Sequence, residues 1–339
     1  MYALGAVLLY GCTGRVPAGT SDFSFTHSNF HEKVALTGED MSIGISQPCD
    51  VKYHPAGYLI FSDQSGGRLL KVVELSSGCT QTLLSRGRAA DEVLSVKDIA
   101  VTYNGFWVSS PQDRKLVRYL FDPAERVFVQ KEVVQAGAQF LRAIPFREGM
   151  FLLEASASSC QRFLIANARG VIVDTLGTFP KLNSGPANNA VFQSAIAVGP
   201  DKESFVAAYA SVDVIDIYDA ANQLHRMIGP DQESFEIRTR NTPLGTQYSV
   251  FPKKNAYSGT SFTSSSIFVG RIGVSLREDE DYLRGISSIL QFSPAGRPER
   301  ELSLSQELVS FDVDEKGGCL YGVSNDPEPV VYVFRYGQK

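Results

Sequence analysis

Short apolar runs alternate with turns rich in Gly, Pro, Asn and Asp along most of the chain. Many of the runs consist of β-branched and aromatic residues, which favour strands over helices. In Val212–Tyr218 polar residues recur at intervals between apolar ones, as is typical of a half-buried strand. The intervening Gly, Pro, Asn and Asp residues suit tight turns. The pattern therefore predicts an all-β protein built of antiparallel strands.

The apolar runs group into six units with the same internal order. In each unit a first run is followed by a short turn, a second run and a third run, and most units close with a more polar fourth run. The first runs lie at 50–53, 98–101, 141–144, 195–198, 259–262 and 310–313. Four antiparallel strands repeating every 40 to 65 residues or so are typical of propeller blades. The sequence predicts a six-bladed β-propeller with four-stranded antiparallel blades.

The sixth unit reaches the C-terminus with only three runs. We expect His31–Leu36, near the N-terminus, to supply its missing outer strand, because this pairing would close the ring and leave no unpaired terminal edge. Residues 30–339 are accordingly assigned to a single propeller domain.

The connections between the runs differ in length. Turns between first and second runs, and between third and fourth runs, are short. Long connections instead link successive units (85–97, 179–192 and 229–257) or join a second to a third run (271–285). In a propeller both of these classes emerge on the same face, so we expect ligands or partners to bind there, around the mouth of the central channel.

Candidate binding residues come from these connections. An anionic or polyol ligand could be bound by Arg86, Arg88 and Glu92, since the planar guanidinium group of arginine carries several hydrogen-bond donors. They could equally form an ion pair between blades or lie in solvent. Tyr209, Tyr257 and Arg271 could add aromatic and donor groups to the same rim, although tyrosine is also common between blades. These are the candidate site residues.

No metal site, cofactor site or catalytic motif is predicted. The acidic run Arg277–Asp281 has ligands that calcium prefers, but consecutive side chains point in different directions, which favours a solvated loop. Asp312–Gly317 begins like a calcium-binding EF-hand loop, but Lys316 and Val323 stand where ligands are needed, which indicates a β-turn. The four histidines, His27, His31, His54 and His225, fall away from the expected channel mouth.

Composition narrows the possible partners. The chain is 43% hydrophobic and 20% charged, with a net charge of −5 and no basic cluster interleaved with aromatic residues. Phosphate binding needs a concentrated positive field, so nucleic acid is not an expected partner. Four cysteines (Cys49, Cys79, Cys160 and Cys319) show no metal-ligand spacing, and the sequence leaves their disulfide status open.

The N-terminus begins with an uncharged apolar stretch, residues 2–10, that is too short to span a bilayer as a helix and fits the core of a secretory signal. Leu9-Tyr10-Gly11-Cys12 resembles a bacterial lipobox, in which Cys12 would be lipidated. Residues 1–12 would then be the signal peptide and lipobox, and 13–29 a flexible tether. No Lys or Arg precedes the stretch, so the alternative is a buried N-terminal strand with an incidental cysteine.

Several segments together resemble the TolB-like six-bladed propeller lipoproteins of Bacteroidetes, over roughly residues 30–337. The resemblance is carried by Gly87–Leu94, Ile289–Pro298, Phe311–Glu315 and Leu320–Val323. Ala89-Ala90-Asp91 replaces the usual Gly-Pro-Gly, whereas Glu92 keeps its place. The resemblance implies the propeller fold and export to the cell envelope rather than a particular activity.

Two functional hypotheses follow. The first is a lipid-anchored envelope protein, on the periplasmic side of the outer membrane or at the cell surface, that binds a protein, peptide or glycan through the long-loop face without catalysis. Thr13–Val16 lacks an acidic stretch, which favours the periplasmic side. The alternative is an envelope enzyme of the lactonase, lyase or hydrolase type that uses carboxylates and a metal in the channel.

Overall fold

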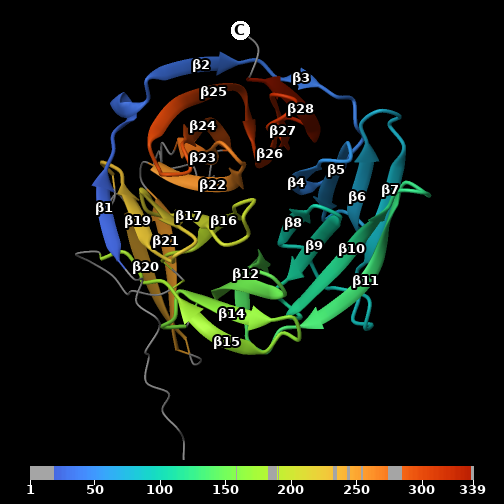
Figure 1. Cartoon of the computed structure of the whole chain (residues 1–339), viewed down its shortest axis with the longest axis horizontal. Coiled ribbons are helices and arrows are strands. Elements are labelled where there is room, and N and C mark those ends of the chain that lie inside the picture. Colours follow the sequence, from blue (N-terminus) through green and yellow to red (C-terminus); the bar gives the residue numbers. More distant parts are fainter. Residues whose placement is uncertain are drawn as a thin grey trace, which may run out of the picture.

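Six β-sheets stand around a common axis in the computed structural model (Figure 1), which confirms the predicted six-bladed propeller. The structure describes residues 19–336 except 158, 182–188, 190, 232–234, 243–244, 253–254 and 274–284. Within these residues the only helix is a short 3-10 turn at His27–Asn29, and no helix is long and apolar enough to cross a membrane.

Each blade has four antiparallel strands. In blades 1 to 5 these four follow chain order from the axis outward, whereas in blade 6 only the inner three do. Blade 1 comprises β4 (Pro48–His54), β5 (Tyr58–Asp63), β6 (Arg68–Glu74) and β7 (Thr80–Ser85). Blade 2 comprises β8 (Asp98–Thr102), β9 (Gly105–Ser110), β10 (Lys115–Asp122) and β11 (Val127–Gln135). Blade 3 comprises β12 (Phe140–Phe146), β13 (Met150–Ala155), β14 (Phe163–Asn167) and β15 (Ile172–Leu176).

The remaining three blades recruit strands from the N-terminal segment. Blade 4 comprises β16 (Ser194–Val198), β17 (Phe205–Tyr209), β18 (Val214–Tyr218) and β19 (Leu224–Ile228), with β1 (Thr20–Ser24) added outside. Blade 5 comprises β22 (Asn255–Phe262), β23 (Ile267–Gly273), β24 (Ile286–Phe292) and β25 (Pro298–Leu308), with β2 (Glu32–Leu36) outside. Blade 6 comprises β26 (Ser310–Asp314), β27 (Cys319–Ser324), β28 (Val330–Arg335) and the outer strand β3 (Glu39–Asp40).

The two ends of the propeller carry different connections. Most of the long connections predicted at 179–192 and 271–285 lies outside the described residues. The innermost strands of all six blades lie nearest the axis (Figure 1). Connections between blades and between second and third strands share one end, here called the long-loop face. The remaining tight turns form the turn face. The connection from blade 4 to blade 5 also contains a hairpin of its own, β20 (Phe235–Thr242) and β21 (Gly245–Pro252).

The ring is closed by the N-terminal segment, but not by the strand that the sequence predicts. Residues 32–36 form β2, which pairs in parallel with β25 of blade 5, from Glu32 opposite Arg300 to Leu36 opposite Leu304. The outer strand of blade 6 is instead β3, whose Glu39 and Asp40 pair with β28. The prediction for 31–36 was wrong because the apolar pattern marks a strand but does not specify which sheet edge it joins.

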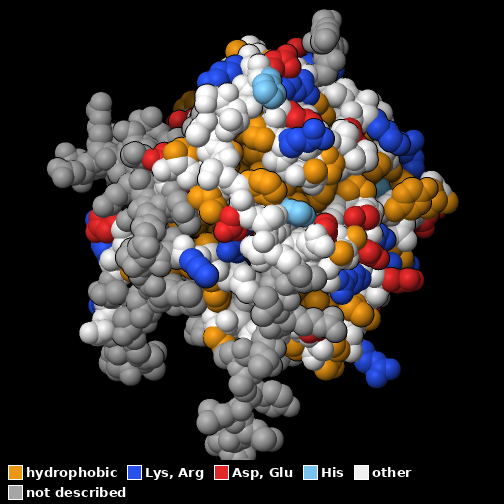
Figure 2. All heavy atoms as spheres, turned by 60° about the vertical axis from the view of Figure 1, so that its left-hand side comes forward, with side chains coloured by type: hydrophobic (Ala, Val, Ile, Leu, Met, Phe, Trp, Pro, Cys, Tyr) orange, Lys and Arg blue, Asp and Glu red, His pale blue; other side chains and the backbone are white. Residues whose placement is uncertain are grey.

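Residues 20–40, here called the strap, therefore run along the outside of three consecutive blades. The segment 20–29, which the sequence analysis assigns to the tether, contains β1, which pairs in parallel with β19. Phe25 and Phe30 anchor the strap: both are buried, and their rings lie 6.0 and 5.4 Å from the ring of Phe292 at the end of β24. Figure 2 brings this side of the molecule forward and shows hydrophobic side chains interspersed with charged ones.

We expect Phe30→Ala to lower the free energy of unfolding by about 3 to 5 kcal/mol, because it leaves a cavity where the strap meets blades 4 and 5. Phe23→Ala is the matched control, since Phe23 belongs to the same strap but is 53% exposed. Its effect should stay within about 0.5 kcal/mol. Chemical denaturation measures both. Equal losses in the two variants would show that the strap does not depend on this aromatic anchor.

Candidate functional site

The channel wall on the side of blades 1 to 3 carries charged side chains at the start of each inner strand. Asp50 and Lys52 lie on β4 with their carboxylate and ammonium groups 3.6 Å apart, Asp98 begins β8, and Arg142 lies near the start of β12. These side chains are partly exposed, from 13% for Asp98 to 27% for Arg142. Because inner strands start at the long-loop face, the charges gather at that mouth of the channel.

The carboxylates of this wall are held by the neighbouring blade. Asp50 accepts hydrogen bonds from the backbone N–H of Ile99 in blade 2 (3.2 Å) and the hydroxyl of Ser310 in blade 6 (2.6 Å). Asp98 of blade 2 forms an ion pair and a hydrogen bond with Arg142 of blade 3. Each carboxylate thus joins two sheets that share no backbone ladder.

The same arrangement continues around the ring. Glu154 of blade 3 accepts hydrogen bonds from the backbone N–H and hydroxyl of Ser194 in blade 4, at 2.8 and 3.0 Å. Asp312 of blade 6 accepts from Ser261 Oγ of blade 5 (2.7 Å) and from the backbone N–H of Tyr53 in blade 1 (2.9 Å).

Between blades 4 and 5, Asp213 accepts a hydrogen bond from the hydroxyl of Tyr257. A carboxylate therefore crosses every one of the six blade interfaces. Asp50, Asp98, Glu154, Asp213 and Asp312 are here called the carboxylate ring.

Glu154 is completely buried, as Asp213 is, and its partner is a buried arginine. Its Oε1 lies 2.8 Å from Nη1 of Arg162, and both side chains are fully buried. Arg162 also donates to Oδ1 of Asn189 (2.6 Å) and to Oγ of Ser194 at the start of blade 4 (2.7 Å). A buried charge pair of this kind tolerates loss of one partner poorly, because the other charge is left without compensation.

A second cation lies beside Arg142 at the mouth. The positive charge of Arg142 and burial lower the pKa of Lys97, which precedes β8, against the opposing effect of Asp98. Lys97 has no ion pair within the part of the chain that the structure describes. Burial alone would lower the pKa of neighbouring Lys52, but Asp50 and Asp312 outweigh it and raise that pKa. The mouth thus presents charges of both signs. Of its three cations, Lys52 and Arg142 form ion pairs with carboxylates, whereas Lys97 forms none among the described residues.

The connection from blade 1 to blade 2, on the long-loop face, contains the predicted residues Arg86, Arg88 and Glu92. Arg86 donates to the backbone carbonyl of Gln64 at 2.8 Å, and Glu92 accepts from the backbone N–H of Ala89 within its own loop. Arg88 is exposed. Lys115 at the start of β10 holds this loop through the carbonyls of Ala89 and Glu92, so the loop sits over third strands rather than over the channel.

Of the other three predicted residues, the two tyrosines are not exposed at the rim. Tyr209 and Tyr257 are completely buried, and their hydroxyls bind Asp216 and Asp213. Both are therefore corrected to packing residues, the alternative that the sequence left open for tyrosines between blades. Arg271 lies on β23 and forms an ion pair with Glu301 of β25 at 2.7 Å, within blade 5. Tyr209 contacts the guanidinium of Arg162 through its ring face, 5.0 Å away.

Sequence reasoning missed the carboxylate ring, for which the sequence holds only a partial signal. Polar residues stand within the first three positions of five inner strands: the ring members Asp50 and Asp98, and Arg142, Ser194 and Ser310, which bind ring members. No group of three or more His, Cys, Asp or Glu side chains that could hold a metal ion occurs among the residues that the structure describes. Cys12 and the run Arg277–Asp281 lie outside those residues.

We expect Glu154→Gln to lower the free energy of unfolding by about 3 to 5 kcal/mol, because it removes the negative charge beside the buried Arg162. The matched control is Glu132→Gln, which breaks the exposed pair between Arg118 and Glu132, 3.5 Å apart. That change should cost less than about 1 kcal/mol. Urea denaturation of both variants decides the point. A loss for Glu154→Gln no larger than the control would contradict a stabilising role for the carboxylate.

Comparison with known proteins agrees with this architecture. The model of the TolB-like six-bladed propeller family matches residues 24–316. None of the curated proteins compared matches the chain in sequence.

Similar solved structures cover nearly the whole chain. A member of the DUF4221 family from Bacteroides vulgatus has a TM-score of 0.54 at 10% identity, over 88% of this chain and 95% of that one. A candidate exported protein from Bacteroides fragilis has a TM-score of 0.54 at 12% identity, over 93% and 99%. The aldose sugar dehydrogenase of Streptomyces coelicolor has a TM-score of 0.51 at 12% identity, over 88% and 96%. At these identities the likeness concerns the fold alone. With a family match over most of its length and six four-stranded blades around one axis, the chain belongs to the TolB-like six-bladed propeller family.

Proposed function

We propose that this protein is a binding module of the bacterial cell envelope that holds a polar ligand or partner (a protein, peptide or glycan) at the long-loop face. The observation that carries the proposal is the concentration of partly exposed charges at the channel mouth, next to the long connections between blades. The carboxylate ring makes this mouth rigid, and rigid scaffolds with variable loops are a common arrangement for binding.

The proposed location rests on separate grounds. Residues 2–12 have the pattern of a secretory signal followed by a lipobox, and one similar structure is a candidate exported protein. We infer that the protein is exported and attached to a membrane through lipid on Cys12. Mass spectrometry of protein recovered from membranes tests the anchor. A chain that still begins at Met1 and carries no lipid on Cys12 would contradict it.

Binding at the mouth predicts that charge reversal there weakens capture of partners. We expect Lys97→Glu to reduce recovery of cross-linked partners from envelope extracts several-fold, because it removes the least engaged cation of the mouth. Lys316→Glu is the matched control, since Lys316 is an exposed lysine in the turn between β26 and β27, on the turn face. Quantitative mass spectrometry compares the partners recovered by the two variants with those of the original protein.

The two outcomes separate clearly. Partners retained by Lys316→Glu but lost by Lys97→Glu support a ligand at the long-loop face. If both variants recover the same partners as the original protein, the channel mouth is not the binding surface. Unfolding temperatures of the variants must match, so that loss of capture is not loss of fold.

A further inference from the structure

A hollow of about 380 Å³ opens on the turn face between blades 4 and 5, opposite the face discussed above. Three turns and the end of one strand surround it: the turn before β17, the turn between β18 and β19, the turn between β24 and β25, and Phe262 of β22. Its volume falls within the range of small-ligand sites, about 300 to 1,000 Å³. The hollow is independent of the proposed function, since none of its lining residues belongs to the channel mouth.

One side of the hollow carries two carboxylates, each with one oxygen committed to its own turn. Oδ1 of Asp201 accepts three hydrogen bonds from Glu203 and Ser204. Oδ1 of Asp219 accepts from the backbone N–H groups of Ala221 and Gln223 at 2.9 and 2.8 Å. Within the described part of the chain, Oδ2 of Asp201 has no hydrogen-bond partner. Oδ2 of Asp219 faces only Nε2 of His225, 3.7 Å away.

Among the described residues, neither carboxylate has a lysine or arginine partner. Burial raises the pKa of Asp201, but the hydrogen bonds from Ser204 and Glu203 outweigh it and lower that pKa. Lys202 and Arg297 belong to the same turns. However, neither lines the hollow, and among the described residues neither forms an ion pair with Asp201 or Asp219.

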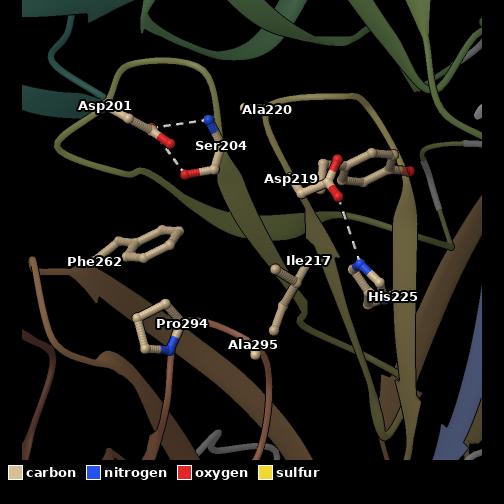
Figure 3. Close-up of a pocket in the computed structure, with 10 residues that line it drawn as sticks. Asp201, Ser204, Ile217, Asp219, Ala220, His225, Phe262, Pro294 and Ala295 are labelled. Carbon is tan, nitrogen blue, oxygen red and sulfur yellow. Dashed lines mark hydrogen bonds and ion pairs between the residues drawn. The ribbon is translucent and has the colours of Figure 1, made fainter.

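The opposite side is apolar. The ring of Phe262 and Pro294 lie across the hollow from Asp219 and His225, and Ile217 and Ala295 line the space between them (Figure 3). The polar groups that remain available are thus mainly acceptors, facing an aromatic ring and aliphatic groups.

This combination selects one ligand chemistry. A sugar offers donors and acceptors in similar number, whereas the two available carboxylate oxygens accept only. An ammonium group donates only, and charge-assisted hydrogen bonds to carboxylates are the strong ones. An aliphatic stem attached to it would pack on Ile217 and Pro294, with the cation near the face of Phe262. We propose that the hollow is a second binding site, specific for an alkylammonium group such as a lysine side chain or a free diamine.

The test uses the full chain and two probes that distinguish these sources. Cadaverine represents a free diamine, and Nα-acetyl-lysine-methylamide represents a lysine within a peptide. Their neutral counterparts are 1,5-pentanediol and Nα-acetyl-norleucine-methylamide. In calorimetric titrations we expect at least one cationic probe to bind about tenfold or more tightly than its neutral counterpart, since hydrogen bonds to charged groups dominate. The cation that binds more tightly identifies the source.

Substitutions locate the binding. Asp219→Asn and Asp201→Asn keep the Oδ1 acceptor that holds each turn but remove the charge. Each substitution should lower the affinity for the cationic probe by about tenfold. Asp122→Asn is the matched control, because Asp122 holds the equivalent turn of blade 2 in the same way and lies outside the hollow. It should leave the affinity unchanged. Phe262→Leu, which keeps an apolar side chain, should cost affinity without loss of fold.

Three results would overturn the proposal. The first is equal binding of cationic and neutral probes, or no detectable binding of either cation at millimolar concentration. The second is affinity that is insensitive to Asp219→Asn and Asp201→Asn. The third is tighter binding of a neutral sugar such as glucose than of either amine. None of these outcomes depends on whether the long-loop face binds a partner.

Discussion

Adjacent blades of a propeller cannot share a backbone hydrogen-bond ladder, because neighbouring sheets meet face to face. In this protein one type of polar interaction makes up for that: a carboxylate from one blade accepts hydrogen bonds from, or forms an ion pair with, the next. Asp50, Asp98, Glu154, Asp213 and Asp312 together cross all six interfaces. Apolar contacts between blades are non-directional, so these carboxylates are what fix the position of each sheet relative to its neighbours.

The position of this ring has a functional consequence. The carboxylates lie near the long-loop ends of the blades, where Lys52, Lys97 and Arg142 also gather. Most of these charges are occupied in holding blades together, so the mouth is polar and rigid before any ligand arrives. Preorganised polar groups lose little freedom on binding, which lowers the cost of recognition. The less constrained connections around the mouth can then vary without disturbing the ring.

The two faces differ in how their polar groups are used. At the channel mouth, carboxylates bridge blades, and few of their oxygens remain free to accept a hydrogen bond from a ligand. On the turn face, Asp201 and Asp219 each use one oxygen to stabilise a local turn and leave the other directed toward solvent or a ligand. The strap adds a further asymmetry, because it covers the outer edges of blades 4 to 6 and leaves β7, β11 and β15 as the outermost strands of blades 1 to 3.

The amino-acid sequence alone determined the strands of the six blades, their grouping and the end of the ring at which the long connections emerge. It did not reveal β1 or the hairpin of β20 and β21. These features follow from local patterns: apolar runs bury one or both faces of a strand, and Gly, Pro, Asn and Asp residues set the turns. Every inner strand expected from the pattern is present, including Asp98–Val101 within β8 and Ser310–Val313 within β26.

Only the tertiary structure decided which distant groups meet. The strap residues 32–36 have a strand pattern, yet the edge they join depends on where the outer strands of blades 5 and 6 lie in space. Tyr209 and Tyr257 sit near long connections in the sequence but are buried in the structure. The hydroxyl of Tyr209 donates to Asp216 of the same blade, and that of Tyr257 donates to Asp213 of the neighbouring blade. Asp50 and Ser310 are far apart along the chain and meet only when the ring closes. Patterns of two to four residues encode the strands, whereas the carboxylate ring arises from contacts between blades, which local patterning does not specify.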